Sequence, residues 1–275
     1  MNVSHSTTPP ASFLDALERD LQRGTGDLPV LAGAAAKALR LAQSPNFDFD
    51  EVVKIAESDP PLAARFLGVA NSALYYRGTT IRSIRAAIVR LGVQATRDVL
   101  YMAVYSGTIF KVPLYRDLVE ATFRHSVIVA RIARRIAELT DSDAEMAFLA
   151  GLLHDVGRAR CLKLASRRRM LSPTREEVVA AADALHAQAG AALARAWHLP
   201  EDVAMACELH HEPGTEAMAL RVAAADRLAH YLTDQQEEDF EAAEGYLELL
   251  GLHEDAAADL LDVGKQDAPL AGATR

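Results

Sequence analysis

The stretch AFLAGLLHDVGR, Ala147–Arg158, joins an apolar, helix-like run to an adjacent histidine and aspartate. A helix that ends at His154-Asp155 presents an imidazole nitrogen and a carboxylate oxygen side by side, and both are donors for one metal ion. Gly157 follows and lets the chain turn tightly beside the pair. An isolated His-Asp pair is more often a helix cap or a surface pair. The pair therefore indicates a metal site only if other parts of the chain supply further ligands.

Helical patterning extends along nearly the whole chain. Apolar residues recur at intervals of three and four, and alternating β-type runs are scarce. In a capping box, the cap side chain and an acid three residues later satisfy the first free amides of a helix. Three pairs fit it: Asp48 with Glu51, Ser142 with Glu145, and Thr174 with Glu177. The sequence therefore predicts an all-α fold.

Domain boundaries are weakly marked, because composition changes little along the chain. The stretch Gly107–Pro113 is the best candidate for a division between two helical lobes. We expect four parts: an N-terminal tail with a leading helix (1–27), an N-terminal helical lobe (28–112), a C-terminal helical lobe (113–263) and a flexible tail (264–275).

Bulk composition indicates a globular protein of 275 residues, 50% hydrophobic and 24% charged. We expect neither secretion nor membrane spanning, since no secretory signal pattern or run of about 18 apolar residues is present. Two cysteines with apolar neighbours suit buried thiols in the bacterial cytoplasm. A net charge of −9 opposes general nucleic-acid binding.

Further histidines and one aspartate lie beside apolar helical residues, so their polar groups are expected to point inward and to need partners. They are His125, His186, His210, His211 and Asp226. Together with His154-Asp155 they could surround a cation. A core network of histidine-to-backbone hydrogen bonds explains the spacing equally well.

The order His125, His154-Asp155, Asp226 resembles the H…HD…D ligand set of the HD superfamily, whose members bind divalent metals and hydrolyse phosphate esters. His186, His210 and His211 resemble the extra ligands of its HD-GYP branch, which cleaves cyclic di-GMP. The resemblance implies a metal site formed by these seven residues. With imidazole and carboxylate ligands the expected metal is iron, manganese or zinc rather than calcium.

Other stretches resemble the HDOD branch more narrowly. LPVLAGAAAKALRLAQ and FDEVVKIAESDPPLAARFLGVANSALYY resemble its opening, with DP-x-L at Asp59 and N-S at Asn71. In IRSIRAAIVRLGVQATRDVL, Leu91-Gly92 is expected to end a helix through the left-handed cap that Gly allows. With FRHSVIVARIARRIAEL and the W-x-L-P of AWHLPEDV, the match covers roughly residues 28–230.

Two departures separate this chain from the HD-GYP enzymes. EPGTEAMAL follows His210-His211, so the Gly-Tyr-Pro loop is missing, and Arg158 replaces the usual Lys that meets substrate phosphate. Arg158 remains a candidate phosphate contact, because Arg binds phosphate bidentately. HDOD domains are regarded as signalling and output modules without established hydrolase activity, and the resemblance implies that role here.

Two hypotheses follow. In the favoured one, the chain is a regulatory module that binds another signalling protein, a second copy of itself or a nucleotide ligand. Its likeliest contact is an exposed patch at Leu74, Tyr75, Tyr76 and Arg77, because aromatic and Arg side chains dominate binding energy at interfaces. In the alternative, it is a metal-dependent phosphohydrolase acting on a nucleotide or cyclic nucleotide, with Arg158 steadying the phosphate.

Overall fold

The computed structural model describes residues 12–23, 33–44, 46–107, 112–253 and 255–265. Within these ranges the regular elements are helices and none is a strand, so the predicted all-α fold is confirmed. The helices are α1 (Phe13–Arg23), α2 (Gly33–Gln43), α3 (Phe49–Glu57), α4 (Pro60–Ala70), α5 (Ile84–Gly107), α6 (Arg116–Leu139), α7 (Ala144–Leu153), α8 (Val156–Arg167), α9 (Arg175–Ala196), α10 (Glu201–Leu209), α11 (Ala217–Asp234), α12 (Glu237–Leu249) and α13 (Asp255–Lys265), with 3₁₀ turns at Pro113–Tyr115 and Arg169–Leu171. No helix in the described part is long and apolar enough to cross a membrane.

Helix starts follow the predicted caps at two of three places. The Asp48 carboxylate accepts from the Glu51 N–H, and Thr174 with Glu177 forms a complete capping box. The predicted cap at Ser142 is wrong, because Asp143 caps α7 instead. Ser142 still belongs to the preceding turn, where its hydroxyl donates to the Thr140 carbonyl.

Helix α5 is two helical pieces with a break at Gly92. Gly92 has φ 73° and ψ −178°, a conformation open chiefly to glycine, and helix resumes directly after it. The predicted helix end at Leu91-Gly92 is therefore confirmed. The expected left-handed cap is wrong, because ψ lies far from the left-handed helical value.

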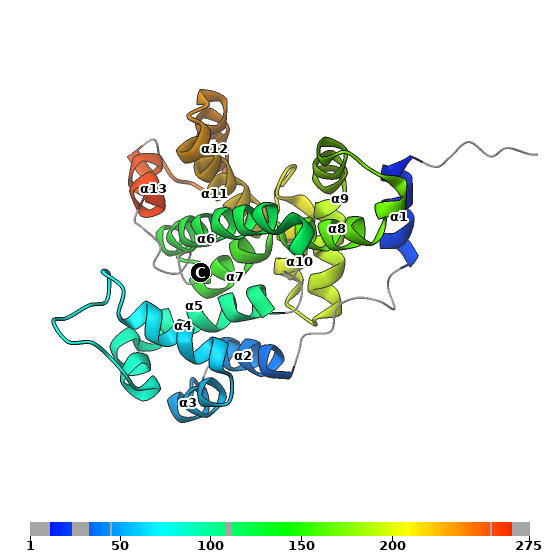
Figure 1. Ribbon diagram of the computed structural model, residues 1–275. Coiled ribbons are helices and arrows are strands. Elements are labelled where there is room, and N and C mark those ends of the chain that lie inside the picture. Colours follow the sequence, from blue (N-terminus) through cyan, green and yellow to red (C-terminus); the bar gives the residue numbers. More distant parts are fainter. Residues whose placement is uncertain (1–11, 24–32, 45, 108–111, 254, 266–275) are drawn as a thin grey trace, which may run out of the picture.

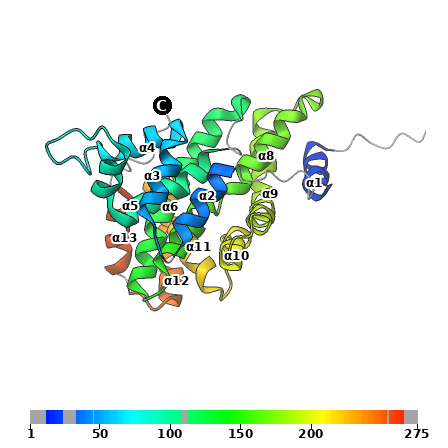
Figure 2. The same cartoon turned by 90° about the horizontal axis from the view of Figure 1, so that it is seen from below.

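The helices form two groups in Figure 1, with α2–α5 below and α6–α13 above. Helix α6 runs through the middle of the upper group and packs against α7, α11 and α13. Helix α1 lies apart from α2 and packs on α8 and α9, where Leu17 is fully buried (Figures 1 and 2). The leading helix thus braces the C-terminal lobe. The division expected at Gly107–Pro113 falls largely on residues 108–111, which lie outside the described residues.

One hydrophobic cluster extends from Ala38 in α2 to Leu261 in α13, so the two groups share a core. An ion pair reinforces their junction. The Arg134 guanidinium donates to both carboxylate oxygens of Asp98 at 2.9 and 2.6 Å and lies 3.8 Å above the Phe148 ring. This junction fixes α5 against α6 and α7, the helices that carry part of the candidate site.

Candidate metal centre

Six helices and their ends bring the seven predicted residues together. They are His125 in α6, His154 directly after α7, Asp155 directly before α8, His186 in α9, His210 and His211 directly after α10, and Asp226 in α11. Three overlapping groups within the set place their donor atoms within 4.8 Å of one another. Residues up to 101 positions apart in sequence thus meet at one place in the C-terminal lobe.

Two helix contacts without room for a side chain allow this convergence. A Cβ on Gly157 would lie 1.9 Å from the His186 carbonyl oxygen, so only glycine lets α8 approach α9 this closely. A Cβ on Gly151 would lie 2.7 Å from the Ala130 Cα and would separate α7 from α6. These contacts bring His154-Asp155 against the helices that carry His125 and His186.

The first cluster forms around the Asp226 carboxylate. Its Oδ1 atom lies 2.7 Å from the His125 Nε2 and 3.5 Å from the His154 Nε2. The second cluster is made of imidazoles: the His186 Nε2 lies 3.3 Å from that of His210 and 3.0 Å from that of His211.

Asp155 lies between the two clusters. Its Oδ1 is 3.2 Å from the His186 Nε2 and 3.8 Å from the His210 Nε2. Its Oδ2 is 3.8 Å from the His154 Nε2. One carboxylate therefore faces both clusters, as a bridging ligand of a two-metal site would.

Backbone hydrogen bonds set the tautomers of three buried rings. A carbonyl oxygen only accepts, so each Nδ1 that contacts one carries the proton. His154 donates to the Gly151 carbonyl at 2.7 Å, His186 to that of Asp183 at 2.7 Å and His210 to that of Cys207 at 2.9 Å. In the neutral rings the Nε2 lone pairs then point into the site, as metal-ligating histidines require.

The electrostatics keep most of this donor set free of protons at neutral pH. Burial lowers the pKa of His210 to about 3 and also lowers that of His186. Burial opposes ionisation of Asp155, but His154 and Arg158 hold its pKa well below the usual range. Asp226 also has a strongly lowered pKa, because the adjacent imidazoles of His125 and His154 outweigh burial. The pKa of His154 is raised instead, because Asp155 and Asp226 outweigh its burial. The site thus offers two carboxylates and the neutral imidazoles of His186 and His210, a set that attracts a cation.

The donor spacing fits a transition metal. Metal–ligand bonds of about 2.0–2.2 Å place neighbouring ligand atoms roughly 2.9–3.5 Å apart in octahedral or tetrahedral geometry. The separations of 3.0, 3.2, 3.3 and 3.5 Å given above lie in this range. In addition, the His154 Nε2 and the Asp155 Oδ1 are buried and have no hydrogen-bond partner. A divalent metal would give both atoms a partner.

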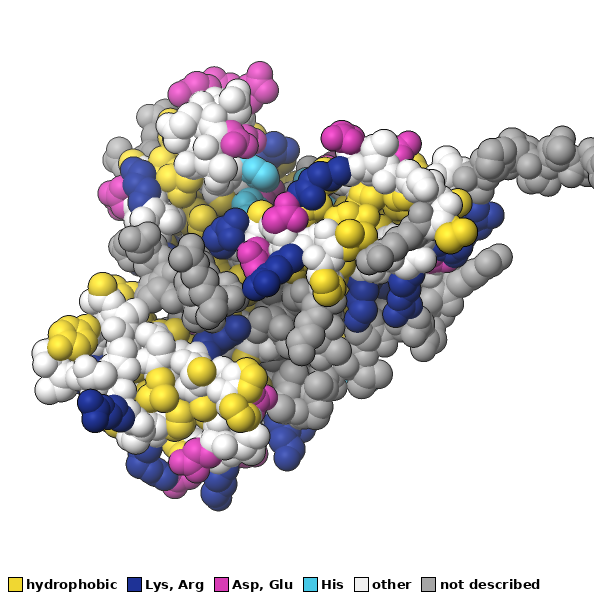
Figure 3. Space-filling view, in the orientation of Figure 1, with side chains coloured by type: hydrophobic (Ala, Val, Ile, Leu, Met, Phe, Trp, Pro, Cys, Tyr) yellow, Lys and Arg dark blue, Asp and Glu magenta, His cyan; other side chains and the backbone are white. Residues whose placement is uncertain are grey.

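One side of the site reaches solvent. His154, His186 and His210 are buried, whereas His211 is exposed and His125 is partly exposed. Figure 3 shows histidine side chains at the surface beside α11 and α12. A small molecule would approach the centre from this face.

Arg158, the candidate phosphate contact, is held by two carboxylates. Its Nε donates to the Asp155 Oδ2 at 2.7 Å, and its guanidinium also pairs with Asp183. Arg158 therefore orients the carboxylate that faces both clusters. A phosphate would have to compete with Asp155 and Asp183 for it.

His230 also lies at the site, although it was not predicted as a ligand from the sequence. It lies one helical turn after Asp226, and its Nε2 is 3.5 Å from the Asp226 Oδ1. The ring centroids of His125 and His230 are 4.7 Å apart. The i,i+4 spacing from Asp226 is the signal that could have found it.

The predicted partner patch lies in the other helix group, on the segment between α4 and α5 that projects at the left of Figure 1. Leu74, Tyr76 and Arg77 are exposed. Tyr75 is half-buried and packs against the core. The Asn71 side chain fixes the segment, because it donates to the Ile81 carbonyl and accepts from the Ile81 N–H.

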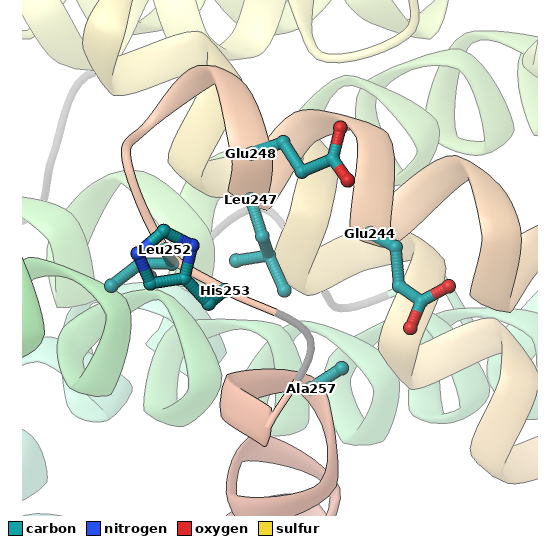
Figure 4. A pocket seen from close by; sticks show the side chains of 6 residues that line it. All are labelled: Glu244, Leu247, Glu248, Leu252, His253 and Ala257. Atoms are coloured by element: carbon teal, nitrogen blue, oxygen red, sulfur yellow. The ribbon is translucent and has the colours of Figure 1, made fainter.

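A small pocket between α12 and α13 is separate from the metal centre. Figure 4 shows its lining residues, Glu244, Leu247, Glu248, Leu252, His253 and Ala257. His253 is exposed, and none of these residues belongs to the clusters described above.

Comparisons with known proteins agree with this fold. Residues 28–213 match the HDOD domain. An uncharacterized protein of Treponema pallidum (strain Nichols) is 25% identical over 198 residues, which are 67% of this chain but 38% of that protein. The chain thus spans well under half of that relative.

Two solved structures share the fold at low identity. A proposed metal-dependent phosphohydrolase of Shewanella amazonensis SB2B has a TM-score of 0.68 and 19% identity, with 96% of this chain and 99% of that chain covered. A proposed signal transduction protein of Marinobacter aquaeolei VT8 has a TM-score of 0.57 and 20% identity, with 93% and 68% covered. Because the HDOD match spans most of the sequence, the chain belongs to the HDOD family.

Proposed function

We propose that this protein is a regulatory HDOD module of bacterial signal transduction, acting in the cytoplasm, whose C-terminal lobe holds divalent metal. The observation that carries the metal site is the convergence of Nε2 lone pairs from buried imidazoles on the Asp155 carboxylate. His125, His154 and Asp226 would hold one ion, and His186, His210 and His211 the other, with Asp155 between them. Iron, manganese or zinc suits this donor set.

The regulatory role is supported by the contacts of Arg158, a cation beside the site. A bound metal supplies positive charge and lowers the pKa of a water ligand. Catalysis on a phosphate ester also needs groups that hold the substrate, and Arg158 is committed to Asp155 and Asp183. The centre is therefore better suited to stabilising the lobe or sensing a nucleotide ligand than to turnover.

The partner would be another signalling protein or a second copy of the chain, bound at the exposed segment between α4 and α5. Leu74, Tyr76 and Arg77 offer an apolar, an aromatic and a cationic anchor, and the Asn71 bonds to Ile81 hold the segment in place. Such preorganisation reduces the entropy lost on binding.

A metal-dependent phosphohydrolase is the second candidate. The observation that favours it is that both clusters have a member at the solvent-facing side, His125 in the first and His211 in the second. A nucleotide could reach the ions there.

Complementation of a deletion strain separates the two candidates. The variants are Leu74→Ala with Tyr76→Ala, and His154→Ala with Asp155→Ala, each checked for native circular dichroism. Truncating an interface anchor typically costs about 2 kcal/mol, roughly thirtyfold in affinity. The regulatory proposal predicts that the surface variant fails to complement. If the His154/Asp155 variant fails while the surface variant complements fully, the phosphohydrolase candidate replaces it.

A further inference from the structure

We propose that His230 is an additional ligand of the metal position formed by His125, His154 and Asp226, and that it closes the solvent-facing side of that position. This inference rests on the metal centre proposed above. It adds a protein donor that lies outside the seven-residue pattern.

The Asp226 Oδ1 atom is the common neighbour of three imidazole nitrogens. The Nε2 atoms of His125, His154 and His230 lie 2.7, 3.5 and 3.5 Å from it. These separations fall close to the roughly 2.9–3.5 Å expected between neighbouring ligands of one ion. His230 is thus as near to the shared oxygen as His154 is.

Asp226 and His230 both lie in helix α11 and point to the same place. Positions four apart lie on one helix face, an arrangement that in other proteins places two ligands on one zinc ion. The His230 side chain is 43% exposed, yet its Nε2 faces the buried Asp226 carboxylate, whose side chain is 5% exposed. Its ring also lies 4.7 Å from that of His125, centroid to centroid. The ring therefore covers the first cluster from outside.

The number of protein ligands decides what such a position does. Catalytic zinc sites usually keep three protein ligands and one open position, whereas structural sites are closed by four. With His230 the first cluster has four donors of its own, besides the Asp155 carboxylate that faces both clusters: His125, His154, Asp226 and His230. A closed position holds its ion tightly and resists substrate entry, which agrees with the regulatory role.

Cobalt(II) binding to the full chain tests the role of His230, because cobalt replaces zinc or iron and its absorption reports the ligands. The variants are His230→Ala and His230→Cys, with the exposed His253→Ala as a matched control. We expect His230→Ala to bind cobalt at least about tenfold more weakly, since even partners outside the ligand shell contribute that much. Added imidazole should restore the wild-type spectrum, and His253→Ala should match the wild type.

His230→Cys separates a ligand from a neighbour that only packs or hydrogen-bonds. A thiolate bound to cobalt gives a charge-transfer band. The wild type lacks it, because burial raises the pKa of both its thiols and the Cys207 Sγ donates to the Leu153 carbonyl. The band is expected in this variant. Wild-type cobalt affinity and spectrum in His230→Ala, together with no such band in His230→Cys, would overturn the inference while leaving the metal centre intact. If wild-type protein itself binds no cobalt, the proposed metal centre fails and His230 loses its role with it.

Discussion

The Nε2 atoms of His186 and His210 lie 3.3 Å apart, although each ring donates its Nδ1–H to a carbonyl of its own helix. Two lone pairs at that distance repel each other unless a cation or a proton lies between them. Burial lowers the pKa of both rings, that of His210 to about 3, so a shared proton is disfavoured near neutral pH. A metal ion resolves the repulsion, and the following predictions test this account.

Stability of the metal-free protein should fall as the pH is lowered from about 6.5 towards 3. The pKa of His210 is about 3 in the folded chain and has an ordinary value of 6.5. Between these values the unfolded chain binds more protons, so the free energy of unfolding decreases as the pH falls. We expect His210→Gln, which removes the titrating ring, to lose less stability between pH 7 and pH 5.

Urea denaturation of chelator-treated protein at the two pH values measures this difference. His253→Gln, at an exposed histidine, is the control and should behave as the wild type. Equal losses in the wild type and His210→Gln would mean that burial does not suppress protonation of His210.

Gly157→Ala should destabilise the protein and weaken metal binding together. The new Cβ would lie 1.9 Å from the His186 carbonyl oxygen and 2.6 Å from the Gly190 nitrogen, so α8 must move away from α9. Overpacking of this kind costs roughly 1–3 kcal/mol. Gly245→Ala in α12 meets no atom within 4 Å and should stabilise instead, by roughly 0.5–1 kcal/mol. Urea denaturation and metal titration of both variants test these two predictions. Unchanged metal affinity in a folded Gly157→Ala protein would contradict the role given to the α8–α9 contact.

Cyclic di-GMP should be hydrolysed slowly or not at all by the metal-loaded protein. Arg158 pairs with Asp155 and Asp183, and the Gly-Tyr-Pro loop is absent from the sequence. We expect turnover well below about one per second, the slow end of ordinary enzymes. A faster rate that disappears in His154→Ala with Asp155→Ala would favour the phosphohydrolase.

The sequence predicted features whose cause is local or follows a known motif. The Thr174–Glu177 capping box depends on neighbouring residues, and the break at Gly92 depends on the conformational freedom of glycine. Convergence of His125, His154-Asp155 and Asp226 followed from a resemblance to the HD superfamily. Helical spacing alone had left a core hydrogen-bond network equally open.

Features set by packing between distant segments were not predictable. Arg158 looked free for phosphate, and its pairing with Asp183 depends on how α8 lies against α9. Tyr75 was expected to be exposed, but it is partly buried and packs against the core. His230 follows Asp226 at helical spacing, yet its nearness to His125 depends on how α11 packs on α6.

The most direct test is the metal content of the purified 275-residue chain, measured by inductively coupled plasma mass spectrometry beside His154→Ala with Asp155→Ala. Both proteins are expressed with iron, manganese and zinc supplied and are checked for native circular dichroism. We predict about two ions per wild-type chain, as in two-metal sites, and a large loss in the variant. Equal trace amounts of metal in the wild type and the variant would contradict the account.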